Sequence, residues 1–429
     1  MTSPSRQSSL NEWVDWLLHL HAQEIDLGLD RVAKVAADME LLRPAKKVIS
    51  VAGTNGKGSS VAMLSAILKA AGYRVGSYTS PHIRRFNERI RINGEMVEDQ
   101  VIVDVFDAIE QARKQTKLTY FEFSTLAALK VFKDQQVDVA VLEVGLGGRL
   151  DAVNIVDADA ALITAIDVDH IDWLGDDRSL IALEKAGIAR TGHPAVCSDP
   201  CPPDTLVNYM RQHQIPFAQI GDDFNYRQKG ENWSFLFAED SVLELPLPAL
   251  KGGFQLQNAA GVLAVLRQLN LPIDKQAIIN GLLSVEHEGR LQVVGVEGQN
   301  WLFDVAHNPQ SAQVLAEYLQ HESAGVEGGS KRVAIFSVLN DKDSLPMVCA
   351  LAPYIDRWAI AELHGPRALP LQKLQSLLQQ SGVSEDKQFA FDSMDDAVFW
   401  AKQQAPDPVL VWGSFFTVSQ VKEALDNAE

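Results

Sequence analysis

The sequence predicts an α/β protein with two domains, each built on a mostly parallel β-sheet that helices cover on both faces. Two features predict this fold class. Short apolar segments of strand length alternate with helical segments, which is the pattern of parallel sheets. The alternation is interrupted by a Gly- and Glu-rich stretch at 286–300 and then starts again. Because 429 residues are enough for about two or three domains, we expect domains at 1–288 and 289–429.

The individual elements follow from apolar spacing and capping residues. Ser9 and Glu12 have the spacing of a capping box, and apolar residues from Trp13 to Leu20 line one face of the helix that follows. In the first domain we expect strands at 48–52, 75–78, 137–144 and 160–166, helices at about 59–71, 121–133 and 258–269, the last leading to the segment 274–283, and an irregular β-rich region at 222–247. In the second domain we expect strands at 301–305, 333–338, 358–361 and 409–412, and a helix at 311–319.

Composition excludes several classes of protein. The net charge of −18 repels nucleic-acid phosphates, so no nucleic-acid partner is expected. Three cysteines make no disulfide framework and are typical of a cytoplasmic protein. Residues 1–7 lack the apolar segment of a secretory signal, and no apolar run approaches the about 18 residues of a membrane helix.

A glycine-rich loop at Gly53–Gly58 stands between the strand at 48–52 and the next helix. Strand, glycine loop with one lysine, and helix are the layout of a phosphate-binding P-loop, in which backbone N–H groups hold phosphates and Lys57 adds positive charge. The usual P-loop spacing is not met, because Gly58 separates Lys57 from Ser59. The alternative is a β–α turn without a ligand, but the placement favours nucleotide binding.

Polar residues follow other predicted strands at the edge where parallel sheets bind ligands. Glu143 ends the strand at 137–144, and Ser80 follows the strand at 75–78. Next to a nucleotide these oxygens suit Mg²⁺, although Glu143 could instead pair with Arg149 and Ser80 could be a turn residue. His170, among three aspartates, is a metal ligand or a structural residue, and Lys185 alone would be read as a surface lysine.

Several ordered strings span nearly the whole chain and together resemble one family. They are similar to the Mur ligase family, and within it to the bacterial bifunctional dihydrofolate synthase/folylpolyglutamate synthases. The matching strings are Ile25–Arg31, Val51–Gly58, Thr79–His82, Thr119–Glu122, Glu143–Asp151, Asp169–Gly175, Glu184–Ile188, Asp304–Pro309 and Gly413–Ser414.

The resemblance implies a P-loop domain followed by a smaller Rossmann-like α/β domain, with ATP contacted by both. It implies a ligase that activates a substrate carboxylate with the γ-phosphate of ATP. The amine of L-glutamate then attacks the acyl phosphate. The expected acceptors are dihydropteroate and tetrahydrofolate, and we expect a monomer with no membrane partner.

The resemblance also implies a set of site residues. Two Mg²⁺ sites are expected at Ser80, Glu143, His170 and Lys185, with Lys185 carrying a CO₂-derived carbamate that requires a depressed lysine pKa. Catalytic roles are expected for Lys57, Lys185 and His307. The expected ATP contacts are Thr54, Asn55, Gly56, Lys57, Gly58, Ser59, Asn258, Arg290 and Asp304. Glu288 departs from the proline that the family usually has two residues before this arginine.

A pterin pocket is expected at three of the matching strings. Phe121 could stack on a flat ring or simply belong to the core, and acidic side chains could accept hydrogen bonds from pterin N–H groups. No general base stands out, and His307 and Asp304 are the candidates. The expected pocket residues are Glu24, Ile25, Asp26, Leu27, Gly28, Thr119, Tyr120, Phe121, Glu122, Leu150, Asp151 and Ala152.

Three other functions are less consistent with the sequence. Another Mur-type ligase acting on a cell-wall nucleotide would need an N-terminal domain for UDP, and only about 50 residues precede the loop. A regulatory NTP switch is disfavoured by the Asp304–Pro309 motif in a second α/β domain. An inert binding module is disfavoured by the combination of Lys57, Glu143 and His170.

Overall fold

The computed structural model describes residues 3–21, 26–237, 241–323, 332–404 and 408–427. The chain divides into two compact units. Unit 1 comprises Met1–Ala249 and Gln255–Glu286, and unit 2 comprises Leu250–Phe254 and His287–Glu429.

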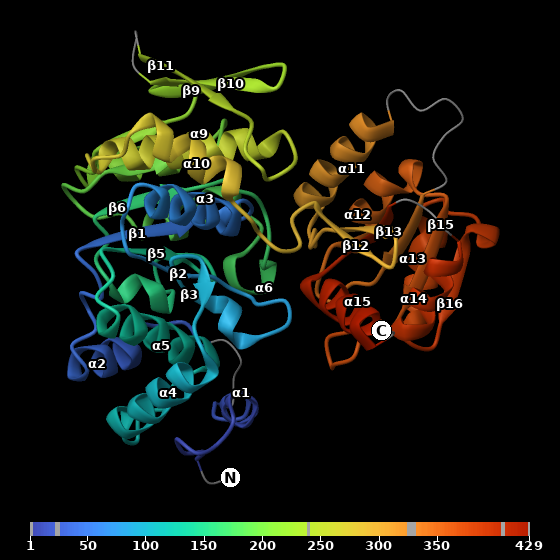
Figure 1. Cartoon of the computed structure of the whole chain (residues 1–429), viewed down its shortest axis with the longest axis horizontal. Helices are drawn as coiled ribbons and strands as arrows, with labels where there is room; N and C mark the ends of the chain where they lie inside the picture. Colours follow the sequence, from blue (N-terminus) through green and yellow to red (C-terminus); the bar gives the residue numbers. More distant parts are fainter. Residues whose placement is uncertain (1–2, 22–25, 238–240, 324–331, 405–407, 428–429) are drawn as a thin grey trace. The chain divides into compact units, whose positions relative to one another are not determined.

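In the described part of unit 1, eight strands form a sheet in the order β4-β3-β2-β5-β1-β6-β7-β8 (Figure 1). The strands from β2 to β8 in this order are parallel, and β3 pairs antiparallel with β2 and β4. β5 is buried along its whole length, as a strand covered on both faces must be. The bounds are β1 (Lys47–Ala52), β2 (Val75–Tyr78), β3 (Ile90–Ile92), β4 (Glu95–Met96), β5 (Val139–Glu143), β6 (Ala160–Ile163), β7 (Ala195–Cys197) and β8 (Phe217–Gln219).

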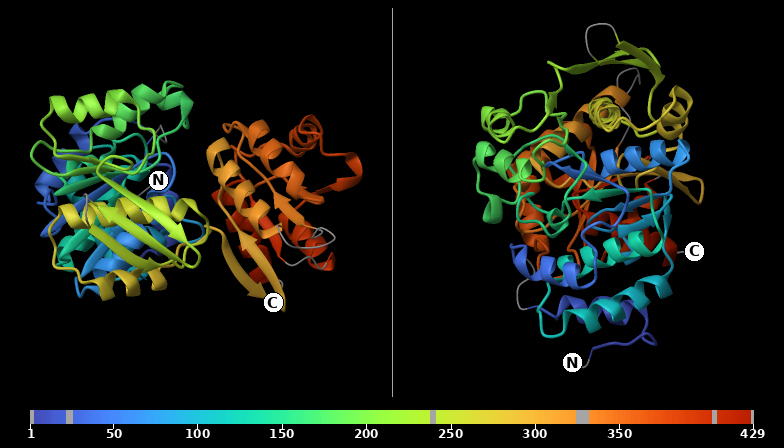
Figure 2. Two further views of the ribbon diagram at one scale, coloured as in Figure 1. Left: turned by 90° about the horizontal axis from the view of Figure 1, so that it is seen from above. Right: turned by 90° about the vertical axis from the view of Figure 1, so that its left-hand side faces the viewer.

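Helices cover both faces of this sheet (Figures 1 and 2). α3 (Lys57–Ala70) and α9 (Phe254–Gln268) lie on one face, and α10 (Lys275–Ser284) packs on α3. α5 (Tyr120–Asp134) lies on the other face (Figure 1). As expected, the capping box of Ser9 and Glu12 begins α1. The remaining helices of unit 1 are α1 (Leu10–Leu18), α2 (Asp30–Asp38), η1 (Phe86–Arg89), α4 (Asp99–Arg113), η2 (Ala152–Ile155), α6 (Ile171–Leu174), α7 (Arg178–Ala186) and α8 (Asp204–Gln212).

Unit 1 also carries a small antiparallel sheet of three described strands, in the order β11-β10-β9. It lies in the β-rich region expected at 222–247. Trp233 and Phe235 of β10 are two positions apart, lie on the same face of the strand, and are both buried. Its strands are β9 (Phe224–Lys229), β10 (Asn232–Phe237) and β11 (Ser241–Pro246).

In the described part of unit 2, six strands form a sheet in the order β12-β13-β17-β14-β15-β16. All neighbours are parallel except the β12–β13 hairpin. Successive residues of β17 point to opposite faces and all are buried, so helices cover both faces here too. The strands are β12 (Gln292–Val296), β13 (Gln299–Phe303), β14 (Val333–Phe336), β15 (Arg357–Ala361), β16 (Gln388–Phe391) and β17 (Val409–Trp412), and the helices are α11 (Pro309–Ser323), α12 (Ser344–Leu351), η3 (Ala352–Tyr354), α13 (Leu371–Gln380), η4 (Glu385–Lys387), α14 (Met394–Gln403) and α15 (Phe415–Asn427).

The stretch at 286–300, expected only as a link, contains strand β12. This strand pairs with β13 alone and none of its five residues is buried. An edge strand without a buried face lacks the apolar alternation that identifies strands in a sequence, so composition alone did not show it.

Within the described residues, no helix is long and apolar enough to cross a membrane. The cysteines Cys197, Cys201 and Cys349 are all free thiols, as expected from their number and spacing.

The contact between α3 and α10 requires a glycine. A Cβ built on Gly281 would stand 2.5 Å from Cα and 2.6 Å from the backbone nitrogen of Ile67. Because backbone cannot move aside as a side chain can, Gly281→Ala should lower the free energy of unfolding by about 1–3 kcal/mol. Urea unfolding would measure this. Gly253→Ala, with no atom within 4 Å of the new Cβ, is the control; equal losses in both variants would contradict the packing argument.

Candidate functional site

The glycine loop connects the end of β1 to the start of α3. Gly56 is the N-cap residue of α3 and has φ +90°, a conformation that favours glycine. A Cβ at this position would also stand 2.4 Å from Oδ1 of Asn258. The first turn of α3 contains no acidic residue, so the positive end of its dipole is not neutralised. This loop therefore has the local geometry of an anion site, as the sequence predicted.

Residues 164–167, which we call the support segment, follow β6 and hold the loop from one side. The backbone N–H of Thr54 donates to Ala165 O at 2.7 Å. The Thr54 hydroxyl donates to Asp167 O at 2.8 Å and accepts from Asp167 N–H at 2.9 Å. The Thr164 hydroxyl donates to Asn55 O at 2.7 Å. The position of the phosphate loop therefore depends on this segment.

Further predicted ATP contacts gather at the same loop. Lys57 Nζ donates to the carbonyls of Gly53 and Thr54, at 3.0 and 3.1 Å. The buried Gln255 and Asn258 of α9 reach the loop's other side, where Gln255 Nε2 donates to Ser59 Oγ at 3.2 Å. Gly58 and Ser59 are themselves buried in the first turn of α3. The structure thus brings Asn258 to the P-loop.

Two of the predicted metal ligands lie together. Glu143, at the end of β5, is buried, and its Oε2 accepts a hydrogen bond from the backbone N–H of Ser80 at 3.2 Å. His170 is exposed and is the N-cap residue of the short helix α6, with φ +54°. Within the described residues, no three His, Cys, Asp or Glu side chains form a metal-binding group. The predicted set contains only two residues of these types, so it stays a prediction.

Lys185 is buried in α7, with 3% of its surface exposed. Burial, together with the positive charge of Lys57, lowers its pKa from 10.5 to about 7, while Asp169 and Glu184 act in the opposite direction. The reading of Lys185 as an ordinary surface lysine is therefore wrong. Because the charge of Lys57 contributes to this shift, the two lysines lie within electrostatic range of each other.

Asp151 closes the Gly-rich turn that follows β5. It is buried, and its carboxylate accepts hydrogen bonds from the N–H groups of Leu146 and Val153, at 2.8 and 2.9 Å. Burial raises its pKa to about 7, although these hydrogen bonds and Lys57 oppose the shift. In this structure Asp151 shapes the turn and lies within electrostatic range of Lys57.

Phe121, expected to stack on a pterin, lies at the same turn. A Cβ on Gly145 would stand 2.5 Å from Phe121 Cζ, so the ring rests directly on this glycine. The Tyr78 ring lies 6.0 Å away, and Phe121 is only partly buried. An aromatic ring with a partly open surface beside the Glu143–Asp151 turn can contact a flat ligand.

The acidic residues expected to bind pterin have partners within the protein. Glu122 forms the capping box of α5 with Thr119, whose N–H donates to Oε2 of Glu122 at 2.7 Å. Arg31 Nε lies 2.8 Å from Oε1 of Glu122, and Arg31 NH1 lies 2.7 Å from Oδ2 of Asp26. Arg31 thus ties the 26–28 loop to α5, a role that the sequence did not reveal because the residues are 91 positions apart.

The other predicted pocket residues vary in exposure. Ala152 is buried at the start of η2, whereas Leu27, Gly28, Tyr120 and Leu150 are partly exposed. Glu24 and Ile25 lie outside the described residues.

A third group of predicted residues gathers in unit 2 beyond the end of β13. Buried Asp304 accepts from the N–H groups of Leu291 and Ala306, at 3.0 and 2.8 Å, and burial raises its pKa although Arg290 opposes the shift. The Phe415 ring lies 5.7 Å from the His307 ring and 5.4 Å from the Arg290 guanidinium, measured from the ring centres. Sequence reasoning missed Phe415, although it directly follows the Gly413–Ser414 string.

Another feature missed from the sequence is the contact between Arg89 and His82. Arg89 Nε donates to His82 Nδ1 at 2.8 Å, and its guanidinium lies 5.1 Å from the centre of the Tyr120 ring. Burial and this cation lower the pKa of His82 to about 4, so its ring is neutral at physiological pH.

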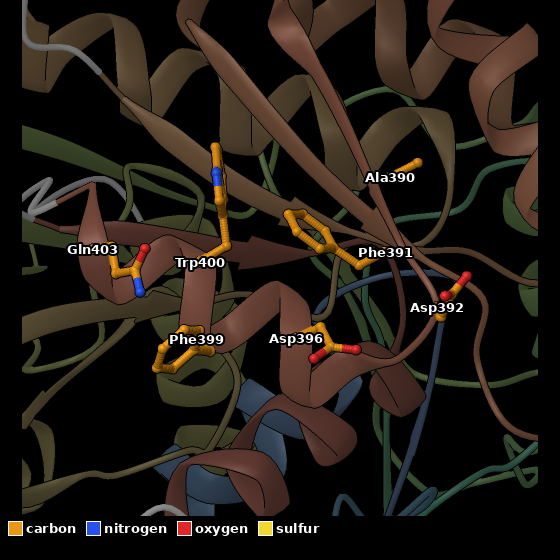
Figure 3. A pocket seen from close by; sticks show the side chains of 7 residues that line it. All are labelled: Ala390, Phe391, Asp392, Asp396, Phe399, Trp400 and Gln403. Carbon is orange, nitrogen blue, oxygen red and sulfur yellow. The ribbon is translucent and has the colours of Figure 1, made fainter.

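A hollow of about 390 Å³ lies in unit 2 (Figure 3). It lies beside the end of β16 and one side of α14. Its lining residues are Ala390, Phe391, Asp392, Asp396, Phe399, Trp400 and Gln403. None of the sequence-predicted site residues lines it.

Comparisons with known proteins match this chain to Mur ligases over nearly its whole length. The Mur ligase middle domain matches residues 51–266, and the Mur ligase glutamate ligase domain matches residues 289–415. A dihydrofolate synthase/folylpolyglutamate synthase of Escherichia coli is 42% identical to this chain. The matched region covers 99% of this chain and 97% of that protein.

Solved structures give the same result. E. coli FolC in complex with DHPP and ADP has a TM-score of 0.92 and 41% identity, covering 99% of this chain and 100% of that one. A bifunctional folylpolyglutamate synthase/dihydrofolate synthase with Mn, AMPPNP and L-glutamate bound has a TM-score of 0.90 and 40% identity, with the same coverage. The fold class and the family predicted from the sequence are confirmed. The chain therefore belongs to the Mur ligase family, among the dihydrofolate synthase/folylpolyglutamate synthases.

Proposed function

We propose that this chain ligates L-glutamate to dihydropteroate, forming dihydrofolate, and to tetrahydrofolate polyglutamates, with ATP as the energy source. The observation that carries the proposal is the buried amine of Lys185 in α7, which lies within electrostatic range of Lys57 of the phosphate loop. The molecules bound to the two solved relatives, DHPP with ADP and L-glutamate with AMPPNP and Mn, support the same set of substrates.

The loop supplies the phosphate chemistry. Backbone N–H groups at the start of α3 would hold the β-phosphate, and the Lys57 ammonium would neutralise charge that develops as the γ-phosphoryl group leaves ATP. Thr54, Asn55, Gly56, Gly58, Ser59 and Asn258 are the proposed ATP contacts of unit 1, and Arg290, Asp304 and His307 are those of unit 2. His307 and Asp304 remain candidates for the general base.

We further propose that Ser80, Glu143, His170 and Lys185 hold two Mg²⁺ ions. The buried Glu143 carboxylate beside Ser80 offers the oxygen donors that Mg²⁺ prefers. Bound Mg²⁺ would neutralise phosphate charge. The buried amine of Lys185, with its pKa near 7, can attack CO₂ as the neutral form and lose a proton, which leaves an anionic carbamate.

We place the pterin near Phe121, whose ring faces the turn at Gly145. Asp26, Leu27, Gly28, Thr119, Tyr120, Glu122, Leu150, Asp151 and Ala152 complete the proposed surroundings. The hydrogen bonds of Glu122 and Asp151 within the protein suggest that they act by shaping the pocket.

Phosphate release tests the proposal. The protein is incubated with ATP, Mg²⁺ and L-glutamate, and with either dihydropteroate or tetrahydrofolate as the acceptor. The masses of the products are then measured by mass spectrometry. Release with both acceptors, each product gaining one glutamyl unit, is expected. Release with tetrahydrofolate alone would reduce the function to polyglutamylation. Release with neither would reject the proposal.

Arg31 should affect the pterin substrate selectively. Arg31→Gln removes the cation that ties Asp26 and the buried Glu122 together, so the 26–28 loop should lose its fixed position. We expect KM for dihydropteroate to rise about tenfold, with KM for ATP little changed. Arg6→Gln, which breaks the exposed pair with Asp107, is the matched control and should change neither. Equal changes in both KM values would argue for general destabilisation instead.

A monomeric state, a cytoplasmic location, the absence of nucleic-acid partners and the division of roles between residues 1–288 and 289–429 remain predictions. Gel filtration of the chain at several concentrations would test the first.

A further inference from the structure

Asp199 and Arg178 form an ion pair, and both side chains also hydrogen-bond to the backbone of Ile166. Asp199 follows β7 and is 3% exposed. Its Oδ2 accepts from Arg178 NH2 at 2.9 Å and from the backbone N–H of Ile166 at 2.7 Å. Arg178 Nε in turn donates to Ile166 O at 2.7 Å, and the second carboxylate oxygen accepts from Cys201 N–H at 2.8 Å. Both backbone polar groups of Ile166 are therefore bound by this pair.

Ile166 lies within the support segment, and the residues on either side of it bind the phosphate loop. Ala165 O accepts from Thr54 N–H, and both backbone polar groups of Asp167 bind the Thr54 hydroxyl. The segment thus has two sets of partners. One set is the phosphate loop, and the other is the Asp199–Arg178 pair.

Arg178 also links the support segment to α7. It is the first residue of α7, the helix that carries Lys185 two turns later. A guanidinium has donors in a fixed planar fork, so it can bind Ile166 O and Asp199 at once and set the start of α7 relative to the support segment.

We propose that Asp199 and Arg178 are positioning residues for nucleotide binding, which hold the support segment so that the phosphate loop and α7 keep their relative geometry. The inference rests on the proposed function, since it takes ATP as the ligand of the loop. Neither residue belongs to the predicted site. Displacing groups that hold a reacting phosphate by about 1 Å can cost up to about 100-fold in rate, so a support of this kind has a measurable effect.

The same sheet offers a matched control at the edge where its parallel strands begin, opposite the edge where Asp199 lies. Asp159 precedes β6, is 7% exposed, and accepts from the Val48 N–H at 2.9 Å and from Arg43 and Lys47. It resembles Asp199 in burial, charge and partners. However, its backbone partner is near the start of β1, whereas the phosphate loop follows the end of that strand.

The experiment compares Asp199→Asn with Asp159→Asn in the full-length chain. Asparagine replaces one carboxylate oxygen with an NH₂ group, which cannot accept the same hydrogen bonds. We expect Asp199→Asn to raise KM for ATP, and to weaken ADP binding measured by calorimetry, by about tenfold. KM for glutamate and tetrahydrofolate should change less than twofold. Asp159→Asn should leave ADP affinity within twofold of wild type.

Arg178 provides a second route if Asp199→Asn does not fold. Arg178→Met should weaken ADP binding as Asp199→Asn does, and Arg178→Lys should recover part of the loss because the ammonium keeps the charge but lacks the fixed planar fork that reaches both partners. Equal ADP affinities for Asp199→Asn and Asp159→Asn, or for Arg178→Met and wild type, would overturn the inference. A wild-type chain that binds no ADP would overturn the proposed function, and the inference with it.

Discussion

Replacing Lys57 with methionine should lower kcat for ligation by about 10²–10³-fold, the usual cost of removing one group that stabilises developing charge. Lys57 Nζ lies at the phosphate loop, donating to the carbonyls of Gly53 and Thr54. No backbone donor can replace its full positive charge. Methionine keeps most of the volume, so the loss should reflect charge. Phosphate release with saturating ATP measures kcat directly.

Lys69 of the same helix provides the control for this substitution. It is exposed in the last turn of α3, far along the helix from the loop. Lys69→Met removes the same charge from the same element and should keep activity within twofold. Full activity in Lys57→Met would mean that this loop does not serve the reaction.

The second large effect is expected at Lys185. Lys185→Met should reduce kcat by about 10²-fold or more, because it removes the anionic carbamate proposed as a metal ligand. Since the wild-type amine is buried, methionine suits the same surroundings and the variant should be at least as stable as wild type. Thermal unfolding of both proteins separates the loss of chemistry from a loss of folding.

The pH dependence follows from the direction of the Lys185 shift. The pKa falls from 10.5 to about 7 on burial, so the amine gains a proton as pH falls through about 7. A protonated amine cannot react with CO₂, and wild-type activity should therefore fall below this pH and recover partly with added bicarbonate. When CO₂ is excluded and Lys185 is a free amine, the folded state binds fewer protons than the unfolded state between about pH 7 and 10.5, so this residue's contribution to stability rises with pH across that window.

Two readouts are specific to the carbamate. Isotopically labelled bicarbonate should give a carbamate signal by NMR in the wild-type chain and none in Lys185→Met, and bicarbonate should not affect the activity of the variant. A wild-type chain without this signal and with bicarbonate-independent activity would show that Lys185 acts as a free amine.

Local patterns carried much of the prediction, because they depend on neighbours in the chain. The capping box of Ser9 and Glu12, the strand ending at Ala52 and the glycine loop before α3 all depend on residues close in sequence. Resemblance then connected strings that no local pattern relates, from the loop at Val51–Gly58 to Asp304–Pro309.

The α/β class, the glycine loop and the family could be inferred from the chain alone, because each is expressed in residue order and spacing. The residues that support the site became visible only in the folded protein. Arg31 reaches Glu122 across 91 positions, and burial beside Lys57 changes Lys185 from an apparent surface lysine into an amine with a pKa near 7. Asp199 lies 33 positions from Ile166. Burial and long-range pairing depend on how strands and helices pack, so no local pattern in the sequence records them.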